Sequence, residues 1–403
     1  MVLNRPDIYR CHNGKKAALP FADEEYNDRL AGLREIMELH DLDAVVLTSM
    51  HNVAYYAGFL YGGFGRPRAC VVTRTDCVTI SPAGDGGRPW RRSIGDSISY
   101  ASGAPDGMWQ AVASVTGTGK AVGCEADHLT MVEAERFGTV LRPKRGMDIA
   151  PAAMQQRMVK SPAEIALIRQ GATVADVGGH AIREAIALGA TELEVSIAGR
   201  DAMEREIARR FPDGEYRDTR VGFQSGINTD GGQGAPTGRR LRRGDILSLN
   251  CVPVISGYCT ALRRTLFLGE VDAASLRVWQ ANIDSRDVGV ALLRAGTSCA
   301  EIARKIDDFL AERELLAYRN VAHGQGVGIL SHGSGREVAL ELREEVDTVL
   351  EPGMVIAMEP ALTIPEGMPG AGGYREQDIF VVTEDAPESL TQDPCGPAFN
   401  VLG

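Results

Sequence analysis

The sequence lacks any long hydrophobic run: no apolar stretch reaches the about 18 residues that a membrane-spanning helix needs. Residues 1–7 also lack the apolar core of a secretory signal peptide. Positive charge is scarce, since 54 acidic side chains outnumber 43 basic ones and give a formal net charge of −11. These absences argue against a membrane or nucleic-acid partner, and we expect a cytoplasmic protein.

The eight cysteines show no CxxC spacing of the kind that indicates a zinc site or a redox pair. In a reducing cytosol we expect them to be free thiols that pack as small apolar residues. Low-complexity segments and short repeats are also absent. A chain of 403 residues is long enough for two domains, each with its own core.

Residues 1–155 have the pattern of a compact α/β domain. Apolar residues recur at helical spacing within 24–40, and the run at 44–48 is typical of a buried strand. Further strand-like runs follow at 69–73, 77–80 and 121–124.

A second domain is predicted over residues 156–403. Ser161, Pro162 and Glu164 are typical of a helix start, with a capping residue, a proline in the first turn and a capping box. The Gly-rich segment 366–373 is expected to be a loop. The segregation of helices from hairpin strands predicts an α+β domain. Helices are expected near 163–188, 192–210, 273–295 and 298–314, and strands near 220–224, 245–254, 258–268, 354–364 and 377–383.

Five motifs of this domain lie at 244–250, 257–265, 324–328, 352–360 and 373–378. In order, they resemble the motifs of the pita-bread family of aminopeptidases, prolidases and creatinases, whose fold is a curved antiparallel sheet backed by helices. The resemblance implies that metallopeptidase members hold two metal ions with Asp, Asp, His, Glu and Glu. The matching residues here are Asn250, Ala261, Gln325, Glu359 and Gln377. Only one of them is a carboxylate, and one carboxylate cannot hold two metal ions, so we expect neither a metal site nor a cofactor.

Longer runs resemble the metal-free creatinase branch over nearly the whole chain, among them 87–92, 223–231 and 365–376. Creatinases carry three histidines at the active centre and a glutamate near them. The matching residues here are Gln233, Gln325, Gln377 and Arg263. An amide cannot act as a general base near neutral pH, although it donates and accepts hydrogen bonds. The glutamines therefore either orient a ligand or water, or only satisfy buried polar groups.

The segment 258–263 contains a candidate nucleophile, Cys259. Strand alternation places Cys259 and Arg263 on the face of Ala261, with Tyr258 on the other face. A thiol beside a cation ionises more readily and becomes a candidate nucleophile. The alternative is that Cys259 is a buried packing residue. Tyr258 is kept as a candidate substrate-binding residue.

Two further residues are candidates for the chemistry. Glu359 matches a creatinase residue of the substrate site, and it either contacts substrate here or pairs with Arg263. His332 follows Gln325 by seven residues, the spacing of a second histidine in the family. Since histidine titrates near neutral pH, His332 is the preferred acid or base. The catalytic candidates are thus His332, Glu359 and Cys259.

Three residues match those that hold the substrate's carboxylate in creatinases: Arg336, Phe64 and Arg66. An arginine suits this task because its guanidinium binds a carboxylate with two hydrogen bonds. In that family the Phe and Arg come from the other subunit, so the resemblance implies a homodimer with a shared site. The substrate-binding candidates are Phe64, Arg66, Gln233, Tyr258, Arg263, Gln325, Arg336 and Gln377.

Three functions remain open. The preferred one is a metal-independent, creatinase-like enzyme that hydrolyses a C–N bond of a small carboxylate-bearing, guanidino- or amino-acid-like metabolite, with creatine itself not expected. His332 and Glu359 would do the chemistry while the glutamines position water. The second is a non-hydrolytic enzyme (elimination, isomerisation or cyclisation) on the same scaffold. The third is a pseudoenzyme that only binds a metabolite.

Overall fold

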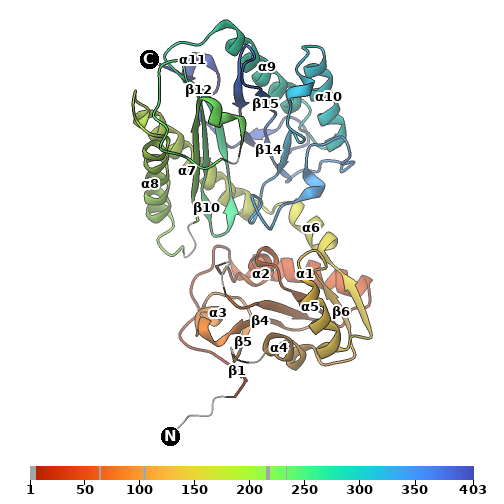
Figure 1. Cartoon of the computed structure of the whole chain (residues 1–403). Coiled ribbons are helices and arrows are strands. Elements are labelled where there is room, and N and C mark those ends of the chain that lie inside the picture. Colours follow the sequence, from red (N-terminus) through yellow and green to blue (C-terminus); the bar gives the residue numbers. More distant parts are fainter. Residues whose placement is uncertain (1–5, 63–64, 102, 104–105, 215–217, 233) are drawn as a thin grey trace. The chain divides into compact units, whose positions relative to one another are not determined.

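The computed structural model describes residues 6–403 except 63–64, 102, 104–105, 215–217 and 233. The chain forms two compact units, Met1–Arg157 and Met158–Gly403 (Figure 1). The boundary expected between residues 155 and 156 falls within helix α6 (Ala150–Met158). No helix of the described residues is long and apolar enough to cross a membrane.

The first unit is built on a mixed seven-stranded sheet with the order β1-β5-β4-β3-β2-β6-β7. The pairs β2–β3 and β3–β4 are antiparallel, whereas β2–β6, β6–β7 and β4–β5 are parallel. The helix and the four strands expected here are all present. The strands are β1 Ile8–Arg10, β2 Ala44–Leu47, β3 Ala69–Thr73, β4 Cys77–Pro82, β5 Asp96–Tyr100, β6 Ala121–Cys124 and β7 Arg145–Asp148. Besides α6, the helices are α1 Asp23–Leu39, α2 Met50–Ala57, α3 Arg88–Arg91, α4 Gly107–Thr116 and α5 Met131–Arg136.

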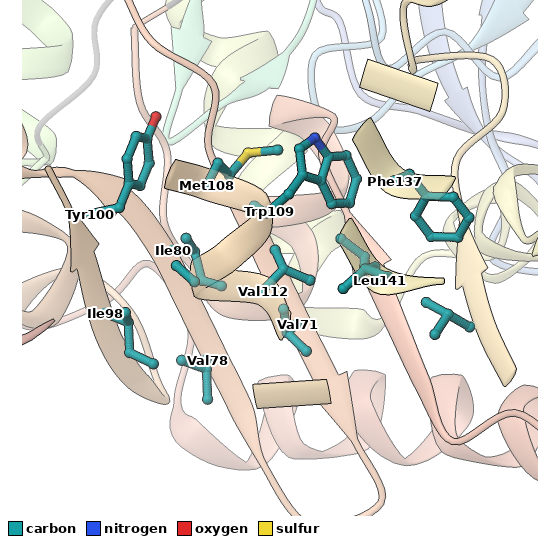
Figure 2. Close-up of a cluster of buried hydrophobic side chains, with 14 of the residues drawn as sticks. Val71, Val78, Ile80, Ile98, Tyr100, Met108, Trp109, Val112, Phe137 and Leu141 are labelled. Atoms are coloured by element: carbon teal, nitrogen blue, oxygen red, sulfur yellow. The ribbon is translucent and has the colours of Figure 1, made fainter. Parts of the chain in front are cut away.

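Helix α4 supplies the centre of this unit's core (Figure 2). Trp109 of α4 is fully buried, and its ring meets that of Phe137 edge-on at 5.6 Å between centroids. Its indole Nε1 donates to Glu133 Oε2 at 2.5 Å, so the polar end of a large apolar side chain is satisfied. Val71, Val78 and Ile80 of the sheet pack in the same cluster.

The second unit separates hairpin strands from helices, as the α+β prediction requires. Two four-stranded sheets have the orders β19-β12-β9-β8 and β13-β14-β17-β18, and a bridge between Arg263 and Gln377 joins them. The strands are β8 Arg220–Ser225, β9 Ile246–Val252, β10 Val254–Ile255, β11 Tyr258–Cys259, β12 Leu262–Leu268, β13 Gly324–Gly326, β14 Val355–Met358, β15 Ala361–Ile364, β16 Gly372–Arg375, β17 Asp378–Val381, β18 Glu388–Ser389 and β19 Val401–Leu402.

Helices α7 and α8 pack against each other, as do α9 and α10 (Figure 1). The predicted capping box of α7 is confirmed, because Glu164 N donates to Ser161 Oγ while the Glu164 carboxylate accepts from Ser161 N. Ser161 thereby satisfies an N–H group that helix formation leaves unpaired. The helices are α7 Pro162–Ala185, α8 Glu192–Arg210, α9 Ala273–Val290, α10 Cys299–Ala311 and α11 Pro397–Asn400.

The prediction that residues 366–373 form a loop is wrong for the last two residues of that segment. The segment 366–373 is not entirely loop, because Gly372 and Gly373 begin β16 and pair with Ile364 and Thr363. The backbone of Thr229 explains the glycine: a Cβ on Gly373 would lie 1.8 Å from Thr229 O. Glycine here therefore permits a close strand approach and does not mark a turn.

Candidate active site

A cleft of about 750 Å³ opens on the face shared by β8, β9 and β12. Alternating residues of these strands point into it, namely Arg220 and Gly222 from β8, Asn250 and Val252 from β9, and Arg263 from β12. The remaining charged and polar residues of its wall are Asn320, Gln325, His332, Arg336, Glu341, Arg343 and Glu359. Positive charge predominates, with four arginines against two glutamates.

One cross-strand row forms the floor. Gly222 faces Asn250, Asn250 faces Arg263, and Arg263 forms a bridge with Gln377. Directly opposed residues of neighbouring strands share a face, so the side chains of Asn250, Arg263 and Gln377 stand side by side. Gly222 contributes no side chain, which leaves the space above Asn250 open.

Arg263 and Glu359 form an ion pair within this site. Arg263 Nη1 donates to Glu359 Oε1 in a short contact, and the two side chains are only 9% and 16% exposed. The position of Glu359 is fixed by β14, which ends at the preceding residue, and by its N–H, which donates to His323 O at 2.8 Å. Of the two roles open for Glu359, the geometry shows the internal pairing.

Several polar atoms around this pair have no hydrogen-bond partner among the described residues. They are Asn250 Oδ1, Arg263 Nε, His332 Nε2, Arg343 Nε and both amide atoms of Gln377. Gln377 is fully buried, so its amide cannot be satisfied by bulk water. Unsatisfied buried groups cost about 1–3 kcal/mol each, and a ligand or ordered water that bonds to them recovers that cost.

The neighbours of Gln377 and Arg263 anchor the opposite face of the strands. Arg264 is buried and donates to Asp378 Oδ1 at 2.7 Å, while its Nε lies 3.4 Å from Asp393 Oδ2. Trp279 Nε1 donates to Glu376 Oε1 at 2.7 Å, and burial raises the pKa of Glu376 to about 7. This network fixes the strand positions of Arg263, which lines the cleft, and of Gln377, which is buried beside it.

His332 lies in the cleft wall beside three arginines. Burial, followed by the charges of Arg263, Arg220 and Arg336, lowers the pKa of His332 to about 3. The imidazole is therefore neutral at pH 7, with Nδ1 3.5 Å from Ser331 Oγ and with no partner for Nε2 in the part of the chain that the structure describes. A neutral imidazole can accept a proton, whereas it has no acidic proton to give at this pH.

Arg336 reaches the cleft from the segment after His332. Its Nε donates to Glu341 Oε1, and Arg343 Nη1 lies 3.3 Å from Glu341 Oε2. Arg336 remains half exposed, with 47% of its side chain accessible. Gln325 of β13 also lines the cleft, held by pairing with Ala357 of β14.

Cys259 and Tyr258 do not line the cleft. The strand expected over 258–268 is interrupted at Thr260 and Ala261, opposite Pro253, which has no N–H to donate. The pairs Val254–Cys259 and Cys251–Leu262 keep one register across the interruption, so Cys259 has the strand parity of Arg263 as predicted. Cys259 is buried, and burial raises the pKa of its thiol. Tyr258 is also buried, and its hydroxyl donates to Glu164 Oε1 at 2.7 Å. The geometry matches the packing alternative for Cys259.

Phe64 and Gln233 fall outside the described residues. Arg66 belongs to the first unit and is exposed. Their roles in substrate binding remain predictions.

Arg220, Glu341 and Arg343 line the cleft but were missed by sequence reasoning. Arg220 had a usable signal, because it shares strand parity with Gly222 at the start of a predicted strand. Glu341 and Arg343 follow a short 3₁₀ turn, Val338–Leu340, where no periodic pattern reveals orientation.

Comparison with known proteins places these observations in a family. Residues 166–384 match the metallopeptidase family M24, and residues 29–159 match the creatinase/prolidase N-terminal domain. The chain is 47% identical over 395 residues to a creatinase of Bacillus sp. (strain B-0618), covering 97% of this chain and 96% of that protein.

The chain belongs to the M24 family. The prolidase from Pyrococcus horikoshii OT3 has the same fold, with a TM-score of 0.79 at 22% identity over 92% of this chain and 99% of that one. The X-Pro aminopeptidase from Thermotoga maritima MSB8 also has a TM-score of 0.79, at 17% identity over 93% and 99%. The predicted pita-bread fold and creatinase-type N-terminal domain are therefore confirmed.

The residues of this M24 site do not fit a pair of metal ions. Four of the five expected ligand positions carry Asn250, Ala261, Gln325 and Gln377, and the carboxylate of Glu359 already binds a guanidinium. Among the described residues, no group of three or more His, Cys, Asp and Glu side chains has a metal-binding arrangement.

The low pKa of His332 predicts a specific acid sensitivity of folding. In the unfolded chain a histidine titrates near pH 6.5, so below that pH the unfolded state binds a proton that the folded state refuses, and stability falls. His332→Gln should remove about 2 kcal/mol of the stability lost between pH 7.5 and pH 5, as measured by urea unfolding. His180→Gln, on the exposed surface of α7, is the matched control and should lose as much as the parent. An equal loss in all three proteins would contradict a neutral His332.

Proposed function

We propose that the protein is a metal-independent M24 hydrolase that cleaves a C–N bond of a small carboxylate-bearing, amino-acid-like or guanidino-like metabolite. The observation that carries the proposal is the place of His332 in the wall of a cleft that arginines make positive, where its Nε2 has no hydrogen-bond partner among the described residues. The 47% identity to a creatinase supports a hydrolase that acts on a small C–N compound.

In the proposed reaction, His332 Nε2 accepts a proton from water as the water oxygen bonds to the carbon of the C–N bond. The same proton then passes to the nitrogen, which leaves as an amine with the bonding electron pair. Arg336 binds the substrate's carboxylate, and Gln325, which lines the cleft, orients the water. Glu359 holds Arg263 in place and is not the base, because its carboxylate is already paired.

Substrate binding also explains how a histidine of such low pKa becomes useful. Burial is the largest cause of the low pKa of His332, and the charges of Arg263, Arg220 and Arg336 lower it further. A bound carboxylate offsets their charge and so raises the pKa of the imidazole toward its ordinary value. The base thus becomes stronger when substrate is present.

The role of His332 is tested by substitution. A panel of carboxylate-bearing amides, ureas and guanidino compounds, with creatine included, identifies a substrate by mass spectrometry of the cleaved amine. With that substrate, His332→Gln should lower kcat by roughly 10²- to 10⁴-fold with little change in KM. Cys259→Ala is the control and should stay within about threefold of the parent, because its thiol is buried away from the cleft. An inactive Cys259→Ala variant with an adduct trapped on the sulfur would instead establish covalent catalysis.

Metal independence is tested on the purified protein. Elemental analysis should find zinc, manganese and iron far below one ion per chain, and turnover should survive excess chelator, since one paired carboxylate remains of five ligand positions. Turnover that disappears with chelator and returns with a divalent metal would refute this part of the proposal.

We further propose a cytoplasmic homodimer whose sites are completed by Phe64 and Arg66 of the partner subunit. Arg66→Ala and Arg336→Ala should each weaken substrate binding by about 1.5–3 kcal/mol, the strength of a charge-assisted contact. Mixed subunits should recover activity, because some sites of a heterodimer then carry both arginines. A mixture that exchanges subunits yet never exceeds either parent would exclude a shared site.

A further inference from the structure

The floor of the cleft carries a second polar region besides the one at Arg336. It consists of the opposed side chains Asn250, Arg263 and Gln377. Arg263 Nε and Gln377 Nε2 are buried donors without a partner among the described residues. Arg263 lines the cleft, and Gln377, which is fully buried beside it, has its side chain on the same face because directly opposed residues share a face.

The ion pair disfavours a cationic ligand group in this region. The carboxylate of Glu359 is already bound by Arg263, and the cleft's other glutamate, Glu341, is bound by Arg336. A second guanidinium brought to about 4 Å from Arg263 would meet a repulsion of about 4 kcal/mol from that guanidinium at an effective dielectric constant of 20, which the paired carboxylate of Glu359 offsets only in part. An oxyanion there can instead accept from the donors of Arg263 that Glu359 does not use and from the amide of Asn250.

The space above the row is kept open by Gly222. A Cβ at this position would lie 3.6 Å from Asn250 Cβ and Nδ2, an ordinary van der Waals contact. Alanine at 222 is therefore compatible with the fold, but its methyl group would occupy cleft volume beside Asn250.

We propose that Asn250, Arg263 and Gln377 form a second oxyanion subsite, so that the cleft selects a dicarboxylate, with one carboxylate at Arg336 and the other at Arg263. This inference rests on the proposed function for the location of the site and narrows its substrate to acidic, amino-acid-like compounds with two carboxylates. Arg220 and Arg343, which also line the cleft, add to the positive potential that attracts such a dianion.

The test measures ligand binding by calorimetry and thermal shift, with the whole protein at fixed ionic strength. The probes are succinate, glutarate and adipate, each against the monocarboxylate of equal carbon number, together with creatine and with sodium sulfate as a general anion. At least one diacid should bind about tenfold or more tightly than its monoacid and than creatine. Equal binding of diacids and monoacids, tighter binding of creatine, or sulfate competing as strongly as the best diacid would overturn the proposal.

Two variants locate the effect. Arg263→Gln should abolish the preference for diacids, leave monoacid affinity within about threefold, and improve creatine binding, because Glu359 is then released. Gly222→Ala keeps the ion pair and should weaken the best diacid about tenfold through its methyl group, while monoacids are unaffected. Gly222→Ala therefore still tests the second subsite if Arg263→Gln fails to fold. An unchanged diacid preference in Gly222→Ala would place the second carboxylate elsewhere.

The binding test and the turnover test can contradict the two proposals independently. If hydrolysis is found but the diacid preference is absent, only the second subsite is wrong. If diacids bind as expected but no C–N bond is cleaved by any panel compound, the subsite stands and the hydrolase proposal fails.

Discussion

The ion pair between Arg263 and Glu359 is the interaction on which the chemistry of this site depends. A buried carboxylate in an empty cleft would either attract a cation or take up a proton, because an unpaired charge is costly to bury. With Arg263 beside it, Glu359 has its counter-charge within the protein. The Nε of Arg263 has no partner among the described residues, and the four arginines of the cleft outnumber its two glutamates.

That excess of positive charge also affects the state of His332. Burial lowers the pKa of the imidazole most, and three arginines lower it further, so the state of the histidine depends in part on the charges that would bind an anion. The strands that carry Arg263 are in turn held from behind by the Arg264 network with Asp378 and Asp393. Site charge and strand anchoring therefore come from successive residues of β12.

The sequence predicted the architecture well because its signals were local. The Ser161–Glu164 capping box and the buried strand β2 each depend on a few neighbouring residues, and both appear as expected. Signals failed where distant segments meet. The strand is interrupted at Thr260, opposite Pro253, which has no N–H for the return bond, and Gly373 pairs with Thr363 where Thr229 O approaches closely. Neither contact is readable from periodicity.

The site, too, was predictable only in part. Motif spacing predicted that Arg263, Gln325, His332 and Glu359 share one site, and all four line the cleft. The spacing left open whether Glu359 pairs with Arg263 or contacts substrate. Substitution of residues that bind a cation leaves the cleft's shape intact while it changes the sign of its potential. The 47% identity to a creatinase therefore supports a shared fold, whereas ligand preference depends on the charged residues that line the cleft. In this chain those charges favour an anion at both ends of the cleft.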